Sequence, residues 1–239
     1  FVEAGAATHQ RPDHRGRAGI NPLRHKVIYT IDDTAFEQIR RISAGIGLED
    51  IKAFQRRWVA LGSVAAETES EIEFLGKRFR LGKEFDVTSV PDERDMGEIL
   101  KWVREARRQA DWVLMSIHCH EEDRYPEPPP AFLETFARRC VDEGVDAFLG
   151  HGPHFTRGVE ICNGKPIFYG LGNFVFQNET YKWAPHDTYE AHGLGYDETT
   201  ADAWDARTLK GTTSFYSDPK YWHGLVAQPI FEGWQLKKV

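Results

Sequence analysis

The chain has 239 residues, of which 41% are hydrophobic and 13% aromatic, so it can bury a sizeable core and disorder is not the default. Its formal net charge is -7 and it contains no basic run, which argues against nucleic-acid binding and against an anionic membrane surface. It has no apolar stretch of about 18 residues and no signal-peptide pattern, so we expect a soluble protein whose localisation the sequence leaves open.

The first part of the chain divides into an irregular segment and a predicted insertion. Residues 1–30 are rich in Gly, Arg, His and Pro and show no apolar period, which predicts irregular structure. Residues 31–88 are interpreted as a cap or insertion. Apolar residues recur there at helical spacing on either side of Gly45 and Gly47, which predicts two short amphipathic helices, and residues 74–87 alternate like a pair of strands.

Residues 89–239 are predicted to form the core of an α/β fold within a single catalytic-type domain. Helical periodicity begins after an acidic residue, Asp92 or Asp95, that can cap the helix. The short apolar run at 112–117 then predicts a strand buried on both faces of a sheet. His118 stands at the carboxyl end of this strand.

A second helix and a second strand repeat this order. The helix is expected over the apolar period of residues 132–141, and Gly144 is placed to end it. The strand at 145–149 leads directly to His151. Because open α/β sheets assemble their sites at the carboxyl ends of strands, the sequence predicts a site there.

The rest of the chain is predicted to hold two hairpins and a long polar segment. Asn163-Gly164 between two apolar stretches predicts a hairpin turn, and residues 221–230 and 234–239 are expected to form a closing hairpin around Gly233. Residues 178–219 are rich in Gly, Asp and Thr, which predicts a long loop or lid. Its aromatic residues and those just after it can line a pocket or pack within the loop: Tyr181, Trp183, Tyr189, Trp204, Phe215, Tyr216, Tyr221 and Trp222.

Four histidines follow the two predicted strands. In His118-Cys119-His120 the imidazoles face the same way only if the backbone stays extended, and Cys119 then faces the opposite side as a small hydrophobic residue. His151 and His154 flank a Gly-Pro turn that can aim both rings inward. Neutral imidazole is a common ligand of Zn, Mn, Fe or Ni, and two-metal hydrolases use such clusters to make hydroxide and bind phosphate oxygens.

Each of these histidines has a simpler interpretation as a polar loop residue. Their gathering at two consecutive strand ends favours metal binding by His118, His151 and His154. For His120 two roles remain open, a metal ligand or a group that acts beside the metal in proton transfer.

Five further polar residues are predicted to have supporting roles. Glu121 and Glu122 can accept an imidazole N–H or lie solvated in a loop. Asn173 can ligate or orient a phosphate, or serve in a turn. Arg17 and Arg24 can bind an anionic substrate or form surface salt bridges. The three cysteines lack CxxC spacing, and we find no serine nucleophile elbow, P-loop or dinucleotide fingerprint.

Four segments, Ser116-Ile117-His118, Gly150-His151-Gly152-Pro153-His154, Gly158-Val159-Glu160 and residues 165–174, together resemble the signature of the poly-gamma-glutamate capsule biosynthesis (CapA-type) family. Residues 16–24 are similar to a subgroup of it, so the resemblance runs from about residue 15 to the end. This family belongs to the calcineurin-like metallophosphoesterase superfamily. The resemblance therefore implies a layered α/β sandwich of mixed sheets flanked by helices. It also implies divalent metal ions, Mn, Zn or Fe, with two in a complete site.

By this resemblance His118 is the late single histidine ligand, and His151 and His154 are the closing ligand pair. Gly152 stands where many members have histidine, and Cys119-His120 stands where many have Trp-Gly. The early acidic motifs of the superfamily, Asp-x-His, Gly-Asp-x-x-Asp and Gly-Asn-His-Asp/Glu, do not precede His118. Either an absent N-terminal segment or a partner chain supplies those ligands, or the dinuclear site has been lost. Three imidazoles alone would still leave a position open for water.

Two functions follow as hypotheses. One is a non-catalytic accessory protein of capsule polymer synthesis that binds an anionic chain. The other is a metal-dependent hydrolase of calcineurin-like type acting on a phosphoester or a poly-glutamyl-type substrate. In the hydrolase the roles are metal binding by His118, His151 and His154, catalysis by His120 and Asn173, and binding of a small or polymeric anionic substrate by Arg17 and Arg24.

Overall fold

In a computed structural model, the described residues are 5–58, 67–177 and 180–239, and they form an α/β fold with mixed sheets flanked by helices. The predicted fold class is thereby confirmed and agrees with the calcineurin-like type. The chain divides into two compact units, unit 1 (residues 1–111 and 121–144) and unit 2 (residues 112–120 and 145–239). None of the described helices is both long and apolar enough to cross a membrane.

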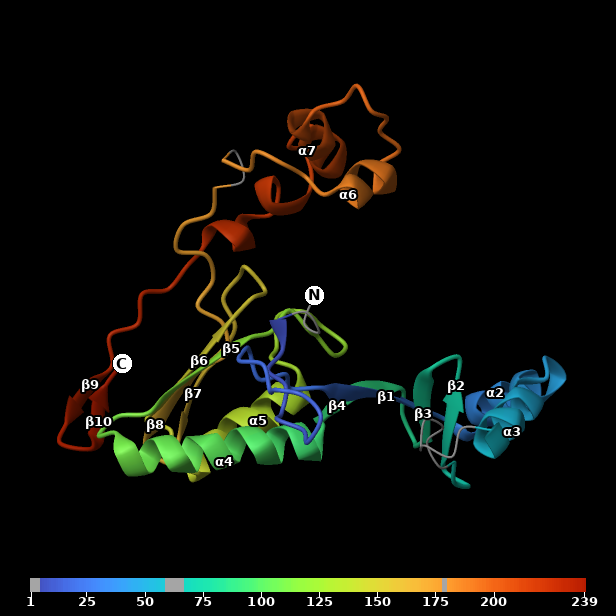
Figure 1. The fold of residues 1–239 in the computed structure, drawn as a ribbon, viewed down its shortest axis with the longest axis horizontal. Helices are drawn as coiled ribbons and strands as arrows, with labels where there is room; N and C mark the ends of the chain where they lie inside the picture. Colours follow the sequence, from blue (N-terminus) through green and yellow to red (C-terminus); the bar gives the residue numbers. More distant parts are fainter. Residues whose placement is uncertain (1–4, 59–66, 178–179) are drawn as a thin grey trace. The chain divides into compact units, whose positions relative to one another are not determined.

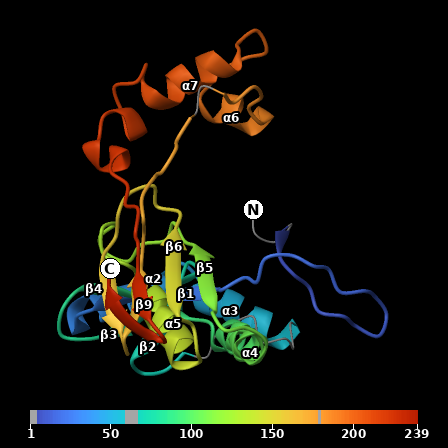
Figure 2. The same cartoon turned by 90° about the vertical axis from the view of Figure 1, so that its left-hand side faces the viewer.

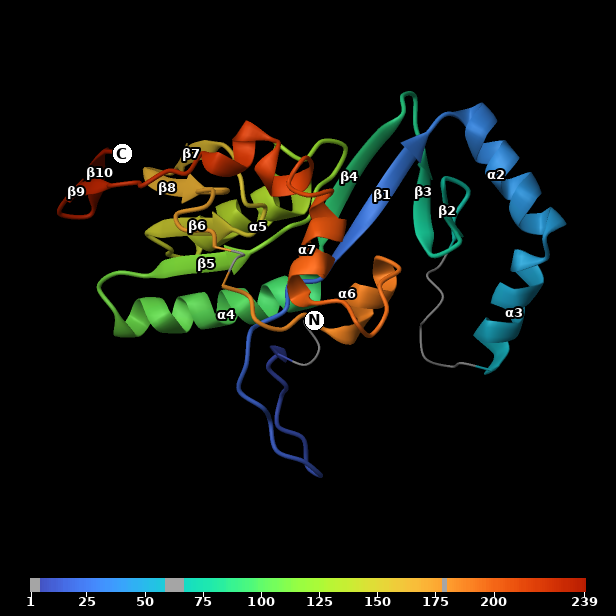
Figure 3. The ribbon, with the colours of Figure 1, turned by 90° about the horizontal axis from the view of Figure 1, so that it is seen from above.

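Unit 1 is built on a four-stranded mixed sheet of order β2-β3-β1-β4. β1 (His25–Ile31) runs parallel to β3 (Lys77–Leu81) and antiparallel to β4 (Asp86–Pro91), and β2 (Glu71–Phe74) is antiparallel to β3. Figure 3 shows β1 and β4 lying side by side. The prediction of irregular structure for residues 1–30 is wrong from His25 onward, because the β-branched and aromatic residues of this stretch pair with strands on both sides.

The chain between β1 and β4 carries the two predicted helices, α2 (Asp33–Gly45) and α3 (Leu48–Trp58). Asp32 begins α2 because its side chain accepts a hydrogen bond from the backbone N–H of Ala35. Gly47, with a φ of 75°, lies between the two helices. The same segment also contributes β2 and β3 to the sheet, and its interpretation as a cap or insertion stays a prediction. The apolar period of the sequence extends the second helix to Leu61, which lies outside the described residues.

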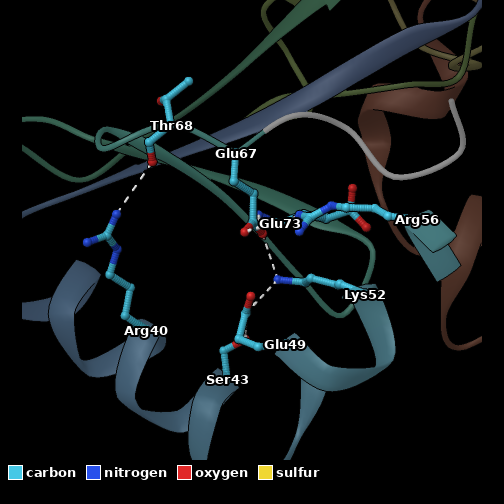
Figure 4. Close-up of polar contacts among 8 residues, drawn as sticks. All are labelled: Arg40, Ser43, Glu49, Lys52, Arg56, Glu67, Thr68 and Glu73. Carbon is cyan, nitrogen blue, oxygen red and sulfur yellow. Dashed lines mark hydrogen bonds and ion pairs between the residues drawn. The ribbon is translucent and has the colours of Figure 1, made fainter. Parts of the chain in front are cut away.

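The insertion packs on the sheet through a small apolar core and a buried ionic cluster. Phe36 of α2, only 1% exposed, contacts Ile31 of β1 and Ile72 of β2. Nearby, the ammonium group of Lys52 lies 2.9 Å from Glu49 and 2.6 Å from Glu67 (Figure 4). Because two carboxylates face this buried cation, its charge is compensated and α3 is tied to the segment that precedes β2.

Two long helices complete unit 1. Of the two predicted caps, Asp92 is the one that begins α4 (Glu93–Gln109), since its side chain accepts hydrogen bonds from two backbone N–H groups. α5 (Ala131–Asp142) packs against β4, and its Phe132 stacks on His25 of β1 with ring centroids 4.4 Å apart. Gly144, with a φ of 110°, follows the end of α5, as expected.

Unit 2 holds a second four-stranded sheet, of order β5-β6-β8-β7. β5 (Leu114–His118), β6 (Ala147–His151) and β8 (Lys165–Phe168) are parallel, and β7 (Val159–Cys162) is antiparallel to β8. Figure 2 shows β5 and β6 next to each other. Positive φ angles at Asn163 and Gly164, 48° and 74°, confirm the predicted hairpin turn between β7 and β8.

The two parallel strands that carry the histidines differ in burial. Phe148 of β6 is fully buried, as expected for a central strand. β5 is at the edge of the described sheet and alternates between exposed and half-buried residues, with Leu114 63% exposed. The prediction that β5 is buried on both faces is therefore wrong, because its apolar composition resembles that of a central strand while its position is peripheral.

Asp146 fixes the start of the unit 2 sheet. Its carboxylate, buried to 3% exposure, accepts a hydrogen bond of 2.9 Å from the backbone N–H of Val113 and lies 2.7 Å from Nζ of Lys165. These residues directly precede β5 and begin β8, respectively. One carboxylate thereby connects three strands at the end opposite to the histidines.

The described C-terminal part of unit 2 contains four short helices, three of which lie in the stretch predicted as a loop. They are α6 (His186–Ala191), α7 (Thr200–Thr208), η1 (Ser214–Tyr216) and η2 (Pro219–Trp222), and α6 and α7 lie close together in Figure 1. A capping box formed by Thr199 and Asp202 begins α7, so local hydrogen bonds rather than an apolar period specify it. The prediction of a loop over 178–219 is wrong for α6, α7 and η1, and residues 178–179 lie outside the described part. The closing hairpin is confirmed by β9 (Ile230–Glu232) and β10 (Gln235–Lys238), but its predicted first strand is wrong over residues 221–229, where η2 begins the stretch and β9 starts only at Ile230.

Candidate active site

His118 and His151 are brought together by the register of two parallel strands. β5 and β6 pair so that His118 lies opposite His151, and each is the last residue of its strand. Their Nδ1 atoms are 3.0 Å apart. Nε2 of His151 lies 3.0 Å from the hydroxyl oxygen of Ser116, which precedes His118 by two residues and therefore shares its face of β5.

His120 lies beside His118 because the backbone stays extended beyond the end of β5. The backbone N–H of Cys119 donates to the carbonyl of His151 at 2.7 Å, which continues the strand pairing by one residue. Nε2 of His120 is 2.9 Å from Nε2 of His118. Cys119 points away and is only 3% exposed, which confirms its prediction as a small buried residue.

His154 reaches the same cluster through a tight turn at Gly152. The ring centroids of His154 and His120 are 5.3 Å apart. Gly152 has a φ of 126°, and a Cβ atom there would lie 2.8 Å from the backbone nitrogen of Cys119. This position therefore excludes any side chain in this backbone arrangement.

Asn173 positions His154. Within the described part of the chain, it forms no hydrogen bond with the other three imidazoles. Its Oδ1 accepts a hydrogen bond from Nδ1 of His154 at 2.9 Å, and its Nδ2 donates to the backbone oxygens of His154 and Tyr221, both at 3.0 Å. His154 itself has a φ of 66°, in the left-handed region that is costly for a residue with a Cβ. The amide thus holds a strained backbone and fixes one ring nitrogen.

The hydrogen bonds link Ser116, His151, His118 and His120 into one chain. If each ring carries one proton, every link has one donor and one acceptor, so the chain is complete with all three imidazoles neutral. Burial lowers the pKa of His151, and repulsion by the charge of protonated His118 lowers it further. Both effects favour the neutral imidazole, which is the form that binds metal ions.

We tested whether the cluster fits the metal ions that the resemblance implies. In the described part of the chain, His, Cys, Asp and Glu side chains form no group of three or more that could hold a metal ion. His118 turns Nδ1 to His151 but Nε2 to His120, so one ion cannot be shared by all three rings in this arrangement. The donor atoms do suit a divalent transition metal. A spacing of 2.9–3.0 Å is also near the distance between two nitrogens that each lie about 2.1 Å from one ion, about 3.0 Å in octahedral and about 3.4 Å in tetrahedral geometry. The cluster therefore offers pairs of ligands rather than a complete set.

The other predicted site residues belong to unit 1. Arg24 binds Asp95 through Nε at 2.7 Å and Nη2 at 2.6 Å, and this pair lowers the pKa of Asp95. Arg17 donates from Nε and Nη2 to the carbonyl oxygen of Ala6. Glu121 and Glu122 also fall in unit 1 and are exposed. Substrate binding by Arg17 and Arg24, and acceptance of an imidazole N–H by Glu121 and Glu122, stay predictions.

The sequence left two alternatives for the aromatic residues of the C-terminal segment, lining a pocket or packing within the loop. Tyr181, Trp204 and Phe215 line a cavity of about 290 Å³ that also includes His154. Arg207 and Phe176 line the same cavity, and sequence reasoning missed both. The available signal was the capping box before α7, which would have placed Trp204 and Arg207 one turn apart on a helix. Ser116 was also missed, although its spacing from His118 indicated the same strand face.

Comparisons with known proteins identify the family. The family model for the bacterial capsule synthesis protein PGA_cap matches residues 49–178, a stretch that includes the four histidines and Asn173. The chain therefore belongs to this family. The chain is 29% identical to the uncharacterized protein y4sH of Sinorhizobium fredii over 93% of its own length and 47% of that protein.

Two named relatives match shorter stretches. The PGA biosynthesis protein CapA of Bacillus subtilis is 30% identical over 62% of the chain and 37% of the relative. A protein of Mycobacterium tuberculosis named as a probable polyglutamine synthesis accessory protein is 35% identical over 50% of the chain and 31% of the relative. The chain thus spans about half the length, or less, of these curated relatives.

Proposed function

We propose that the imidazole cluster is the histidine part of a metal-dependent hydrolase site acting on a phosphoester or a poly-glutamyl-type substrate. The observation that carries this proposal is the convergence of His118, His120, His151 and His154 from two strand ends and one tight turn. Side chains outside the cluster would complete the ligand set. A bound divalent ion would lower the pKa of water to about 7 and polarise the scissile bond.

The roles of the residues follow from their hydrogen bonds. His118, His151 and His154 would bind the metal as neutral imidazoles, and Asn173 would hold His154 in position. His120, at the end of the chain that begins at Ser116, would accept or donate the proton that moves during hydrolysis. Arg24 would have to leave Asp95 to bind an anionic substrate, so the geometry favours a structural role for this residue.

The experiment is hydrolysis of two probes, bis(4-nitrophenyl) phosphate and γ-glutamyl-4-nitroanilide, by metal-loaded and chelator-treated protein. We expect one probe to be cleaved, the chelator to abolish cleavage, and His120→Ala to lower the rate by about 100-fold or more. His192→Ala, an exposed histidine at the end of α6, serves as the control and should change nothing. Cleavage that survives both the chelator and His120→Ala would contradict the proposal.

A second function is that of a non-catalytic accessory protein of poly-gamma-glutamate synthesis, and it is supported by the similarity to the Mycobacterium tuberculosis relative, which is named as a probable polyglutamine synthesis accessory protein. In that case the protein would bind a polyglutamate chain and hydrolyse neither probe. Calorimetric titration with polyglutamate separates the two functions. Binding without hydrolysis, in protein that carries less than one metal ion per chain, would favour the accessory function and overturn the hydrolase.

A further inference from the structure

A cavity of about 290 Å³ in unit 2 adjoins the histidine cluster at His154. Its wall includes four aromatic rings from separate segments, those of Phe176, Tyr181, Trp204 and Phe215. The ring of His154 packs against Phe176 and Phe215, with centroids 5.0 and 5.3 Å apart. One imidazole of the proposed site is therefore also part of the cavity wall.

The aromatic wall is held in place by specific contacts. The indole N–H of Trp204 donates to the hydroxyl of Tyr216 at 3.0 Å, which fixes the orientation of the indole ring. Phe176 and Phe215 contact each other with centroids 4.9 Å apart. The capping box of Thr199 secures the first turn of α7, the helix that carries Trp204. The cavity thus presents ring surfaces that are ordered before a ligand arrives.

Arg207 supplies a positive charge at the same cavity. Its guanidinium lies over the ring of Trp204, 5.4 Å from the ring centroid. Within the described ranges no carboxylate lies at ion-pair distance from Arg207, in contrast to Arg24, which is bound by Asp95. A guanidinium stacked on an aromatic ring keeps its N–H donors at the edge of its plane, where an anion can bind.

We propose that this cavity is the substrate-recognition pocket of the site and binds a planar aromatic group that carries an anionic group. Rings such as Tyr181 and Trp204 favour a planar apolar group, and Arg207 matches a phosphate or carboxylate attached to it. The volume lies at the lower end of ligand pockets, about 300–1,000 Å³, which suits a single ring. A polyglutamate chain fits this cavity less well, because it would place several carboxylates against four aromatic rings and one guanidinium.

This inference rests on the proposed function for its role in catalysis, and it narrows the substrate to an anionic ester with an aromatic group. The test therefore measures binding alone. Phenylphosphonate and methylphosphonate share the anionic group and differ in the ring, so the ratio of their dissociation constants reports the ring contribution. We expect phenylphosphonate to bind about tenfold tighter, the equivalent of about one good ring contact. Equal affinities would overturn the inference.

Variants locate the ring preference in this cavity. Trp204→Ala and Tyr181→Ala should each reduce the preference to about threefold or less. Tyr181 is 50% exposed, so its removal leaves the fold intact even if Trp204→Ala does not. The matched control is Trp183→Ala, because Trp183 is 83% exposed, lies in the same segment and is not part of the cavity wall. A preference that survives Tyr181→Ala, or that Trp183→Ala removes, would contradict the proposed location.

The charge is tested separately. Arg207→Gln should weaken phenylphosphonate binding by about tenfold and leave the neutral probe benzyl alcohol unaffected, whereas Arg207→Lys should retain most of the affinity. Equal phenylphosphonate affinity in Arg207→Gln and in the wild type would remove Arg207 from the proposal.

Both titrations are repeated with metal-loaded and chelator-treated protein. If phenylphosphonate binds more tightly than methylphosphonate but the protein binds no metal ion, the pocket is supported and the hydrolase proposal is refuted. If the protein binds metal but binds the two phosphonates equally, the pocket is refuted and the hydrolase proposal stands.

Discussion

Asn173 holds His154 at two points, through the ring nitrogen Nδ1 at 2.9 Å and through the backbone oxygen at 3.0 Å. The same amide nitrogen also donates to the backbone of Tyr221, so one side chain joins the turn after β6 to the segment at η2. Because the φ of His154 is 66°, its backbone needs such support to stay in this conformation. The imidazole of His154 is thus positioned by Asn173 as much as by its own turn.

We expect Asn173→Asp to lower the free energy of unfolding by about 1–3 kcal/mol, because it removes both N–H donors and sets a carboxylate against two backbone oxygens. The nitrogen chemical shifts of His154 should also change. The control is Asn163→Asp in the β7–β8 turn. Asn163 has a positive φ, and both asparagine and aspartate tolerate that conformation. Equal stability of the two variants, with unchanged His154 shifts, would contradict the assigned role of Asn173.

The lack of space at Gly152 gives a second prediction. Gly152→Ala would place a methyl group 2.8 Å from the backbone of Cys119 at a φ of 126°, so the strand ends must separate. We expect a loss of stability of about 1–3 kcal/mol or more, together with displaced histidine signals in NMR spectra. Gly158→Ala, where a Cβ meets no atom within 4 Å, should be neutral. If both variants behave alike, the close approach of Gly152 to Cys119 is wrong.

The buried pair of Asp146 and Lys165 should be a main determinant of the unit 2 sheet. Asp146→Ala removes the acceptor of the Val113 N–H and leaves the Lys165 ammonium half-buried without this carboxylate. We expect a loss of about 3–5 kcal/mol in the free energy of unfolding, measured by denaturant titration. Glu232→Ala, which removes an exposed partner of Lys237, should cost less than about 1 kcal/mol. A comparable effect of both would contradict the importance of the buried pair.

The ion pair of Arg24 and Asp95 predicts a pH dependence for unit 1. Hydrogen bonding from Arg24 holds the pKa of Asp95 below its usual value and outweighs the opposite effect of burial. Asp95 therefore contributes stability that is complete above its unfolded pKa of about 3.9 and is lost as the pH falls through its lower folded pKa. Asp95→Asn should be less stable than the wild type at pH 7, with a smaller decrease in acid. Parallel pH profiles of the two proteins would refute this.

Much of the histidine cluster could be predicted because it depends on short-range pattern. Two apolar runs of similar length, each ending at histidine, predict parallel strands that end at one edge, and the observed register places His118 opposite His151. Cys119 faced the opposite side for the same reason, the two-residue period of an extended chain. The hairpin at Asn163-Gly164 followed from turn chemistry alone.

Features that depend on distant or weakly patterned residues could not be predicted. The pairing of Arg24 with Asp95 joins residues 71 positions apart, so the sequence left a substrate-binding role open for this arginine. α7 has no apolar stripe and is specified by its capping box and by packing of Trp204, so the apolar period of the sequence predicts a loop there. The exposure of β5 reflects its edge position, which its composition does not reveal.

The central claim, that the histidines bind a divalent metal, is tested most directly by elemental analysis after dialysis against Zn²⁺ or Mn²⁺. We predict at least one ion per chain in the wild type and in His192→Ala, and none in the double variant His151→Ala, His154→Ala. Circular dichroism would establish that the double variant is folded. Full metal occupancy in a folded double variant would contradict the claim.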